Sequence, residues 1–269
     1  MGNRNINSTS YVHNDEPNTN DVTKAMEYNA LGKPVLRIAD SLNQPLTVAS
    51  GASHYTPVFK AGYNPTFANG TQESYWGASV AYPWSAWDTP GTVSLVSTST
   101  ADTASVTVYG LDENFAQQTV VYPMTGTVAV TTTEQWARIH HMVYNSSPIP
   151  NAGNVTATID STVVAFIKLG EDASQMAQYT VPAGFTGYVM QGTANIGKGN
   201  DGAGSFRTRF FGGGFQVAMY FQLYQSTFNY VFTTPMKLPE KTDLDVVMTA
   251  SNANTTSSVI YELILIENV

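Results

Sequence analysis

The sequence contains no cysteine and unusually few charged residues. Without cysteine, the chain can form neither a disulfide scaffold nor a thiolate-ligated metal site. Asp, Glu, Lys and Arg make up 12% of the residues, about half the share in an ordinary globular protein. The formal net charge is −8, and the basic residues of the middle of the chain (Lys168, Lys198, Arg207 and Arg209) are too scattered to form a basic stripe. We therefore expect no nucleic-acid partner.

Long hydrophobic runs are also missing. The longest apolar segments, such as Val259–Ile266, have the length of a strand and are too short to cross a bilayer. The polar segment Met1–Asn20 lacks the apolar core of a signal peptide. In addition, Ile6 stands where a myristoylation signal requires Ser or Thr. We therefore expect no membrane partner and no targeting segment.

The residues that are abundant favour β-structure. Aromatic residues reach 12%, and long stretches consist of Thr, Ser, Asn, Val and Gly, which suit a pleated surface with one solvated face. Period-2 alternation predicts strands at Ser94–Ser97, Ser105–Leu111, Thr119–Tyr122 and Thr127–Thr132. Further strands are expected at Trp136–Tyr144, Asn154–Asp160, Val217–Tyr224 and Ser258–Ile266. Turn clusters separate these strands at intervals of about 8–12 residues, as in sandwiches and jelly rolls. The predicted fold is all-β, with tandem β-sandwich or jelly-roll domains.

The composition changes along the chain and predicts three parts. Residues 1–45 form an extended N-terminal arm, because the first 30 residues have too little apolar content for a core. Within the arm, a short helix is expected from Asp21, as N-cap, to Gly32. Residues 46–170 form a first β-sandwich domain and residues 171–269 a second, jelly-roll-like one. The boundary is placed at the break Leu169–Asp172.

The sequence offers little catalytic chemistry. His140 and His141 lie in a predicted strand, where successive side chains point to opposite faces, so we expect that they do not bind one ion. The glycine-rich segment 197–204 lacks the nucleotide-binding and calcium-loop patterns and is interpreted as a hairpin tip. The triplet Gly212–Gly214 is interpreted as a bulge or a close backbone approach.

The acidic pairs also favour a structural role. They stand in turn-like sequence, with nothing to predict the apolar surroundings of a catalytic acid: Asp112-Glu113, Glu171-Asp172 and Asp243/Asp245. No nucleophile elbow and no zinc-protease motif is present. We predict no catalytic residue, no cofactor and no metal, and therefore a protein that is not an enzyme.

One aromatic group is a candidate interface. Trp76, Tyr82, Trp84 and Trp87 crowd into a loop-like stretch. They are interpreted as a plug closing one end of a sandwich, as an anchor between subunits, or as a platform for a sugar ring. The neighbouring proline and small residues favour the plug or the anchor over the platform.

Two predicted strands, Val217–Tyr224 and Ser258–Ile266, carry apolar side chains on both faces. One face serves the core of a sandwich, and a neighbouring domain covers part of the other. The further aromatic residues Phe228, Tyr230 and Phe232 exceed what one internal contact would bury. We therefore expect a homo-oligomer and add Tyr220 and Tyr224 to the candidate interface.

A series of turn and strand motifs carries a family resemblance. In chain order the motifs are Trp76-Gly77, Tyr82-Pro83-Trp84, Val106–Asp112, Met176–Gly184, Phe206–Gly213, Pro235–Leu244 and Glu262–Asn268. In that order they resemble a group of virion structural proteins of tailed bacteriophages, notably those of marine bacteria and cyanobacteria. The resemblance extends from about Trp76 to the C-terminus and does not include residues 1–70.

The resemblance implies a non-catalytic component of a phage particle, made in the host cytoplasm, and carries over no functional residue. The leading hypothesis is a capsid decoration or cement protein whose arm docks on the major capsid protein or another virion protein. A trimer is preferred among oligomers because threefold symmetry suits a capsid lattice. The alternatives are a tail, fibre or baseplate component, which would be present in few copies, and a carbohydrate-binding module using the aromatic loop.

Overall fold

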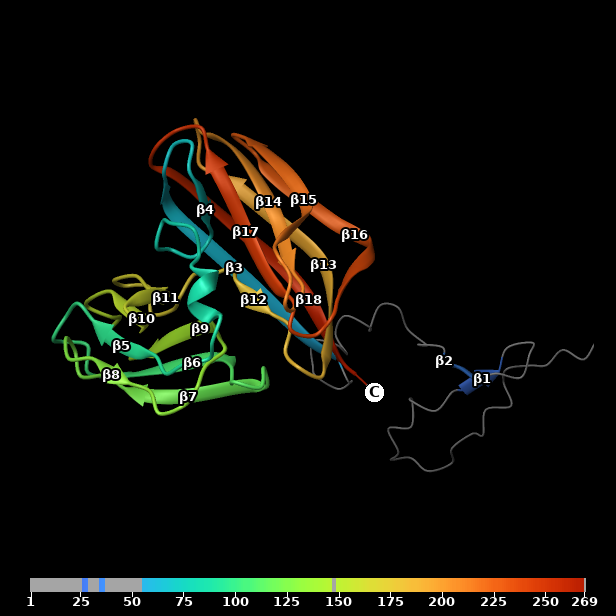
Figure 1. The fold of residues 1–269 in the computed structure, drawn as a ribbon. Coiled ribbons are helices and arrows are strands. Elements are labelled where there is room, and N and C mark those ends of the chain that lie inside the picture. The colour runs from blue at the N-terminus through green and yellow to red at the C-terminus, as the bar shows by residue number, and fades with distance from the viewer. Residues whose placement is uncertain (1–25, 29–33, 37–54, 147–148, 269) are drawn as a thin grey trace, which may run out of the picture. The chain divides into compact units, whose positions relative to one another are not determined.

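The computed structural model describes residues 26–28, 34–36, 55–146 and 149–268, and it is all-β (Figure 1). This confirms the predicted fold class. Residues 1–53 and 54–269 form separate compact units. In the first unit, β1 (Met26–Tyr28) pairs antiparallel with β2 (Pro34–Leu36). The helix predicted from Asp21 to Gly32 is therefore wrong at β1, where backbone groups bond across strands; the rest of that helix, and most of the arm 1–45, lies outside the described residues.

Residues 76–176 form a first lobe with two antiparallel sheets. One sheet has the order β11 (Thr162–Ile167), β10 (Val155–Ile159), β5 (Ser94–Ser97) and β8 (Val130–Thr131). The other has the order β7 (Gln117–Pro123), β6 (Ser105–Leu111) and β9 (Arg138–Asn145). A continuous core fills the lobe, with Leu95, Val106, Met142 and Val155 fully buried. The strands predicted at Ser94–Ser97 and Ser105–Leu111 are confirmed with the same bounds.

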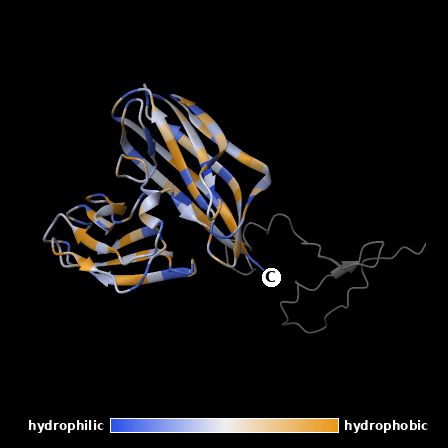
Figure 2. Ribbon diagram, viewed as in Figure 1, coloured by the Kyte–Doolittle hydropathy of each residue, from blue (hydrophilic) through white to orange (hydrophobic). Residues whose placement is uncertain are grey.

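Residues 55–75 and 177–268 form a second lobe, again with two antiparallel sheets. One sheet has the order β16 (Thr227–Leu238), β13 (Phe185–Ile196), β18 (Thr255–Glu267) and β3 (Tyr55–Phe67). The other has the order β12 (Tyr179–Thr180), β17 (Asp243–Ala250), β14 (Asp201–Arg209) and β15 (Gln216–Tyr224), with β4 (Gln72–Ser74) also paired to β17. A separate core, including Phe67, Leu223, Leu244 and Leu263, fills this lobe. Apolar residues run through the strands of both lobes in Figure 2.

The first and the last strands of the range 55–268 belong to the same lobe, the second one. The division into lobes therefore differs from the predicted domains 46–170 and 171–269. Strands β3 and β4 belong to the first of these ranges, yet they pair with β18 and β17. The reason is that β3 and β18 are both 13 residues long and satisfy each other's backbone groups along their length. The first lobe is thus inserted where the Ala177 amide donates to the Tyr75 carbonyl at 2.8 Å. At this junction Gly62 is required, because a Cβ there would lie 2.6 Å from the Tyr75 oxygen.

Two glycine-rich segments differ from their predicted structure. In the segment 197–204, the strand β14 already begins at Asp201, so the turn comprises only Gly197–Asn200. The triplet Gly212–Gly214 lies in the turn between β14 and β15 rather than in a bulge, and Gly212 has a φ of +75° that favours glycine. In the first segment, the ladder between β14 and β15 thus includes Gly202 and Gly204, where the glycine content predicted a hairpin tip.

A buried network of charges joins the two lobes. Arg138 on β9 donates from Nε and Nη2 to the two carboxylate oxygens of Asp243 on β17, at 2.9 and 3.0 Å. Arg209 also donates to Asp243, and Arg207 donates to Asp245 at 2.6 Å. Arg138 and Asp243 are 6% and 3% exposed. Because each buried carboxylate has a charged partner, the network holds β9 against β17.

Candidate functional site

The structure brings Trp76, Tyr82, Trp84 and Trp87 together, but inside the first lobe. All four belong to its core, and none is more than 7% exposed. Trp84 and Trp87 form the ends of the 3-10 helix η2 (Trp84–Trp87). The Trp87 indole donates to the Tyr82 hydroxyl at 2.8 Å, and that hydroxyl donates to the Val164 carbonyl at 3.0 Å. With their polar atoms bonded internally, these side chains present no surface to a subunit or a sugar, which agrees with the plug interpretation.

Tyr220 and Tyr224 lie elsewhere, on β15 of the second lobe. They are 74% and 67% exposed. Four residues apart in one strand, they point to the same face of the sheet, whereas Phe221 and Leu223 point into the core. The two tyrosines are therefore available to another molecule, unlike the four aromatic residues of the first lobe.

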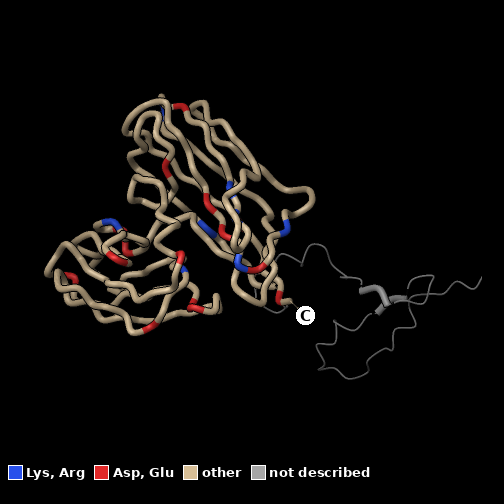
Figure 3. Tube along the Cα trace, in the orientation of Figure 1, with Lys and Arg blue, Asp and Glu red and all other residues tan. Residues whose placement is uncertain are grey.

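The strand that carries them is an unprotected edge. Within the described residues, β15 pairs only with β14, so its other side has unpaired backbone groups. Its nine residues, Gln216–Tyr224, include no charged residue and no proline. In Figure 3 the tube along this strand is accordingly tan, the colour of uncharged residues. Natural edge strands normally carry charge or proline that prevents pairing with other chains. We call this edge, with the exposed side chains of Val217, Tyr220 and Tyr224, the β15 surface.

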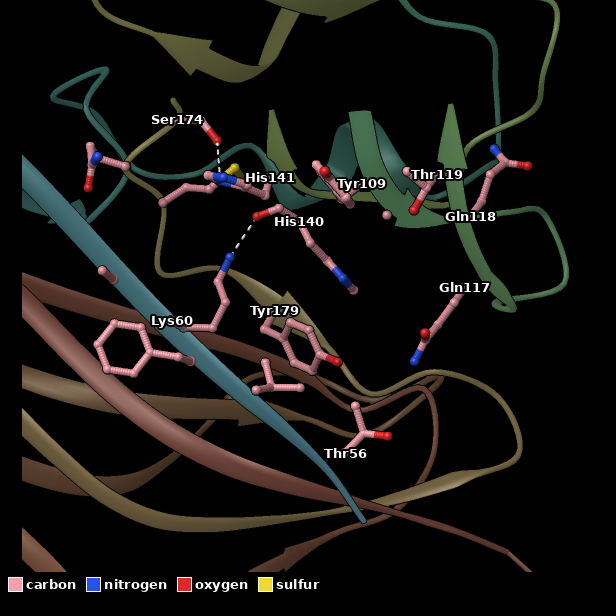
Figure 4. Close-up of a pocket in the computed structure, with 16 residues that line it drawn as sticks. Thr56, Lys60, Tyr109, Gln117, Gln118, Thr119, His140, His141, Ser174 and Tyr179 are labelled. Atoms are coloured by element: carbon pink, nitrogen blue, oxygen red, sulfur yellow. Dashed lines mark hydrogen bonds between the residues drawn. The ribbon is translucent and has the colours of Figure 1, made fainter. Parts of the chain in front are cut away.

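A cavity of about 530 Å³ provides a second candidate site, between β3 and the strands β6, β7 and β9. We call it the Lys60 cleft. Lys60 reaches from β3 toward β9, and its ammonium donates to the His140 carbonyl oxygen at 2.6 Å (Figure 4). The residue is 7% exposed, and burial lowers the pKa of Lys60 to about 7. A lysine in a cavity whose pKa is lowered by burial is a candidate functional residue.

His140 and His141 both line the Lys60 cleft, so the expectation that they point to opposite faces is wrong. The reason is a bulge in β9: Tyr109 pairs with His141 and Gly110 with Ile139, which leaves His140 as an extra residue. Gly110 permits the bulge, since a Cβ there would collide with the Arg138 carbonyl. The signal in the sequence is this glycine inside the predicted strand Ser105–Leu111.

Both imidazoles are neutral at neutral pH. The Nε2 atom of His140 accepts the amide proton of Thr180 at 3.1 Å, which requires that this nitrogen be unprotonated. Burial lowers the pKa of His140 well below its usual value and that of His141 to about 4. The Nδ1 atom of His141 lies 3.1 Å from the Ser174 hydroxyl. The histidines therefore offer hydrogen bonds to the cleft rather than charge.

The described part of the chain shows no cluster of three or more His, Asp or Glu side chains arranged to hold a metal ion. In the same residues, no helix has the length and apolar content needed to cross a bilayer.

No protein-family model matches the chain, and no curated protein matches it. Among solved structures, a chain from the structure of infectious bursal disease virus Gt strain aligns with 79% of this chain and 72% of its own length. The sequence identity is 9% and the TM-score is 0.21. At that TM-score the alignment carries no argument about function.

Proposed function

We propose that this protein is a non-enzymatic structural component of a virus particle that self-associates through the β15 surface. The observation that carries the proposal is the edge strand β15, which is free of charge and proline and exposes Tyr220 and Tyr224. The ordered motifs that resemble those of tailed-phage virion proteins support the particle as the setting. The aromatic cluster at Trp84 and Trp87 is buried, which argues against the carbohydrate-binding alternative at that loop.

A second copy of the chain is the occupant that suits this edge best. The chain has a formal net charge of −8, so two copies repel each other unless their contact lies where charge is absent. The edge β15 meets that condition, and so does the first part of β16, Thr227–Thr233, which exposes Tyr230 and Val231 at the edge of the other sheet. Pairing of β15 in one copy with β16 in the next is heterologous and gives a ring where the rotation between copies closes, and threefold closure suits a capsid lattice. We propose a trimer on this basis.

The test of self-association is the substitution Tyr220→Lys. A lysine on a sheet edge opposes pairing with another chain, so we expect the variant to sediment as a monomer at a micromolar concentration at which the wild type sediments as an oligomer. The control is Val128→Lys, which places the same charge on a residue that is 67% exposed in the first lobe. A monomeric wild type, or an unchanged mass for Tyr220→Lys, would contradict the proposal.

Within the particle, we propose the role of a capsid decoration protein whose arm, residues 1–45, docks on the major capsid protein. Deleting residues 1–30 is expected to leave the number of subunits in the oligomer unchanged and to abolish attachment to particles that lack the protein. Co-sedimentation with the particles measures attachment. The number of copies per particle distinguishes the two roles, because a decoration protein is present in hundreds of copies and a tail component in a handful. Undiminished attachment of the truncated protein would contradict the role of the arm.

A further inference from the structure

We propose that the Lys60 cleft binds a small sugar that carries a carboxylate group. The proposal is independent of self-association, because the cleft lies between β3 and the strands β6, β7 and β9, whereas β15 forms the far edge of another sheet. Three features of the cleft favour such a ligand: an uncompensated cation, neutral hydrogen-bonding groups, and aromatic surface at its wall.

The uncompensated cation is Lys60. Of the three donors of its ammonium, one is used by the His140 carbonyl. The residues that line the cleft include no Asp or Glu and no other Lys or Arg. Burying a charge without a partner of opposite sign is unfavourable. A carboxylate in the cleft would accept the remaining donors of Lys60 and supply the missing negative charge.

The rest of the lining suits the hydroxyl groups and the ring of a sugar. An amide and a hydroxyl line the cleft beside β7, from Gln117 and Thr119, and Thr56 faces them from β3 (Figure 4). Tyr109, which is 40% exposed, adds aromatic surface on which the apolar face of a sugar ring can stack. The volume of about 530 Å³ is within the usual range for small-molecule sites.

Binding should be coupled to uptake of a proton. The groups that face Lys60 are His140, His141, Tyr109 and Tyr179, with Arg138 near His140. None of these supplies negative charge near neutral pH, so burial alone sets the pKa of Lys60 at about 7. A bound carboxylate stabilises the ammonium and raises this pKa. Affinity is therefore highest below pH 7 and falls as the pH increases from 7 toward 9.

The experiment is titration calorimetry of the full chain with glucuronate, and with glucose as the matched ligand without a carboxylate. At pH 7 we expect saturable binding of glucuronate and none of glucose at the same concentration. The heat should depend on the ionisation enthalpy of the buffer, which reports proton uptake. The substitution Lys60→Met should weaken glucuronate binding about tenfold or more, because a charge-assisted hydrogen bond is lost. The control Lys198→Met, at an exposed position, should bind as the wild type does.

Several results would overturn the proposal. Equal binding of glucose would show that the carboxylate is not recognised, and equal binding of inorganic phosphate would show a general anion site without sugar recognition. Wild-type affinity in Lys60→Met would remove Lys60 from the site. If that variant does not fold, the decision rests on the wild type, for which an absence of buffer-dependent heat contradicts the role of Lys60. The oligomer mass is measured in parallel, so failure here is distinguishable from failure of self-association.

Discussion

Replacing Asp243 by Ala is expected to lower the free energy of unfolding by about 3–5 kcal/mol, the effect of breaking a buried ion pair. Asp243 accepts hydrogen bonds from Arg138, Arg209 and the Thr180 hydroxyl. Without the carboxylate, the Arg138 guanidinium stays buried and keeps only the carbonyl oxygens of Trp87 and Ala137 as acceptors. The loss is large because it leaves an uncompensated charge between the lobes.

Urea denaturation measures the change in unfolding free energy. The control Glu113→Ala removes an exposed carboxylate from the turn after β6 and should change it by less than about 0.5 kcal/mol. The double substitution Arg138→Met with Asp243→Leu should cost less than the sum of the single changes, since it removes the pair together. A cost for Asp243→Ala as small as that of the control would show that the network does not hold the lobes together.

Replacing Trp84 by Ala is expected to lower the free energy of unfolding by about 3–5 kcal/mol, as for other large-to-small changes in a core. The Trp84 ring packs edge-on against Tyr82 with centroids 4.8 Å apart, and the Arg209 guanidinium lies 5.3 Å from its centroid. Its indole also donates to Asp245 at 3.1 Å. The substitution therefore opens a cavity in the first core and removes a donor from a buried carboxylate.

The same substitution should leave the oligomer mass unchanged in conditions in which the protein remains folded. The matched comparison is Tyr220→Ala, for which the reverse is expected: nearly unchanged stability of the monomer and weaker association, because Tyr220 is 74% exposed. Sedimentation and urea denaturation of both variants separate the two roles. Dissociation of folded Trp84→Ala would show that the aromatic cluster is an interface and not a plug.

The sequence by itself determined where many of the strands lie. The strand Ser105–Leu111 was predicted with the bounds of β6, because alternation of side chains between two faces is a local property of a strand. An apolar outer face on β15 was also indicated in the sequence, by apolar and aromatic residues at successive positions of Val217–Tyr224. Local pattern was therefore sufficient for the fold class and for two of the exposed residues proposed to mediate assembly.

Only the tertiary structure decided which strands pair and which side chains meet. The pairing of β3 with β18 joins segments about as far apart as the described chain allows, and alternation within a strand does not specify its partner. The bulge in β9 directs the side chains of both His140 and His141 toward the Lys60 cleft. It depends on the close approach of Gly110 to the Arg138 carbonyl. The burial of Trp84 depends on Asp245, which is distant in sequence. Each of these features arises from contacts between distant residues, and periodicity along the chain contains no information about them.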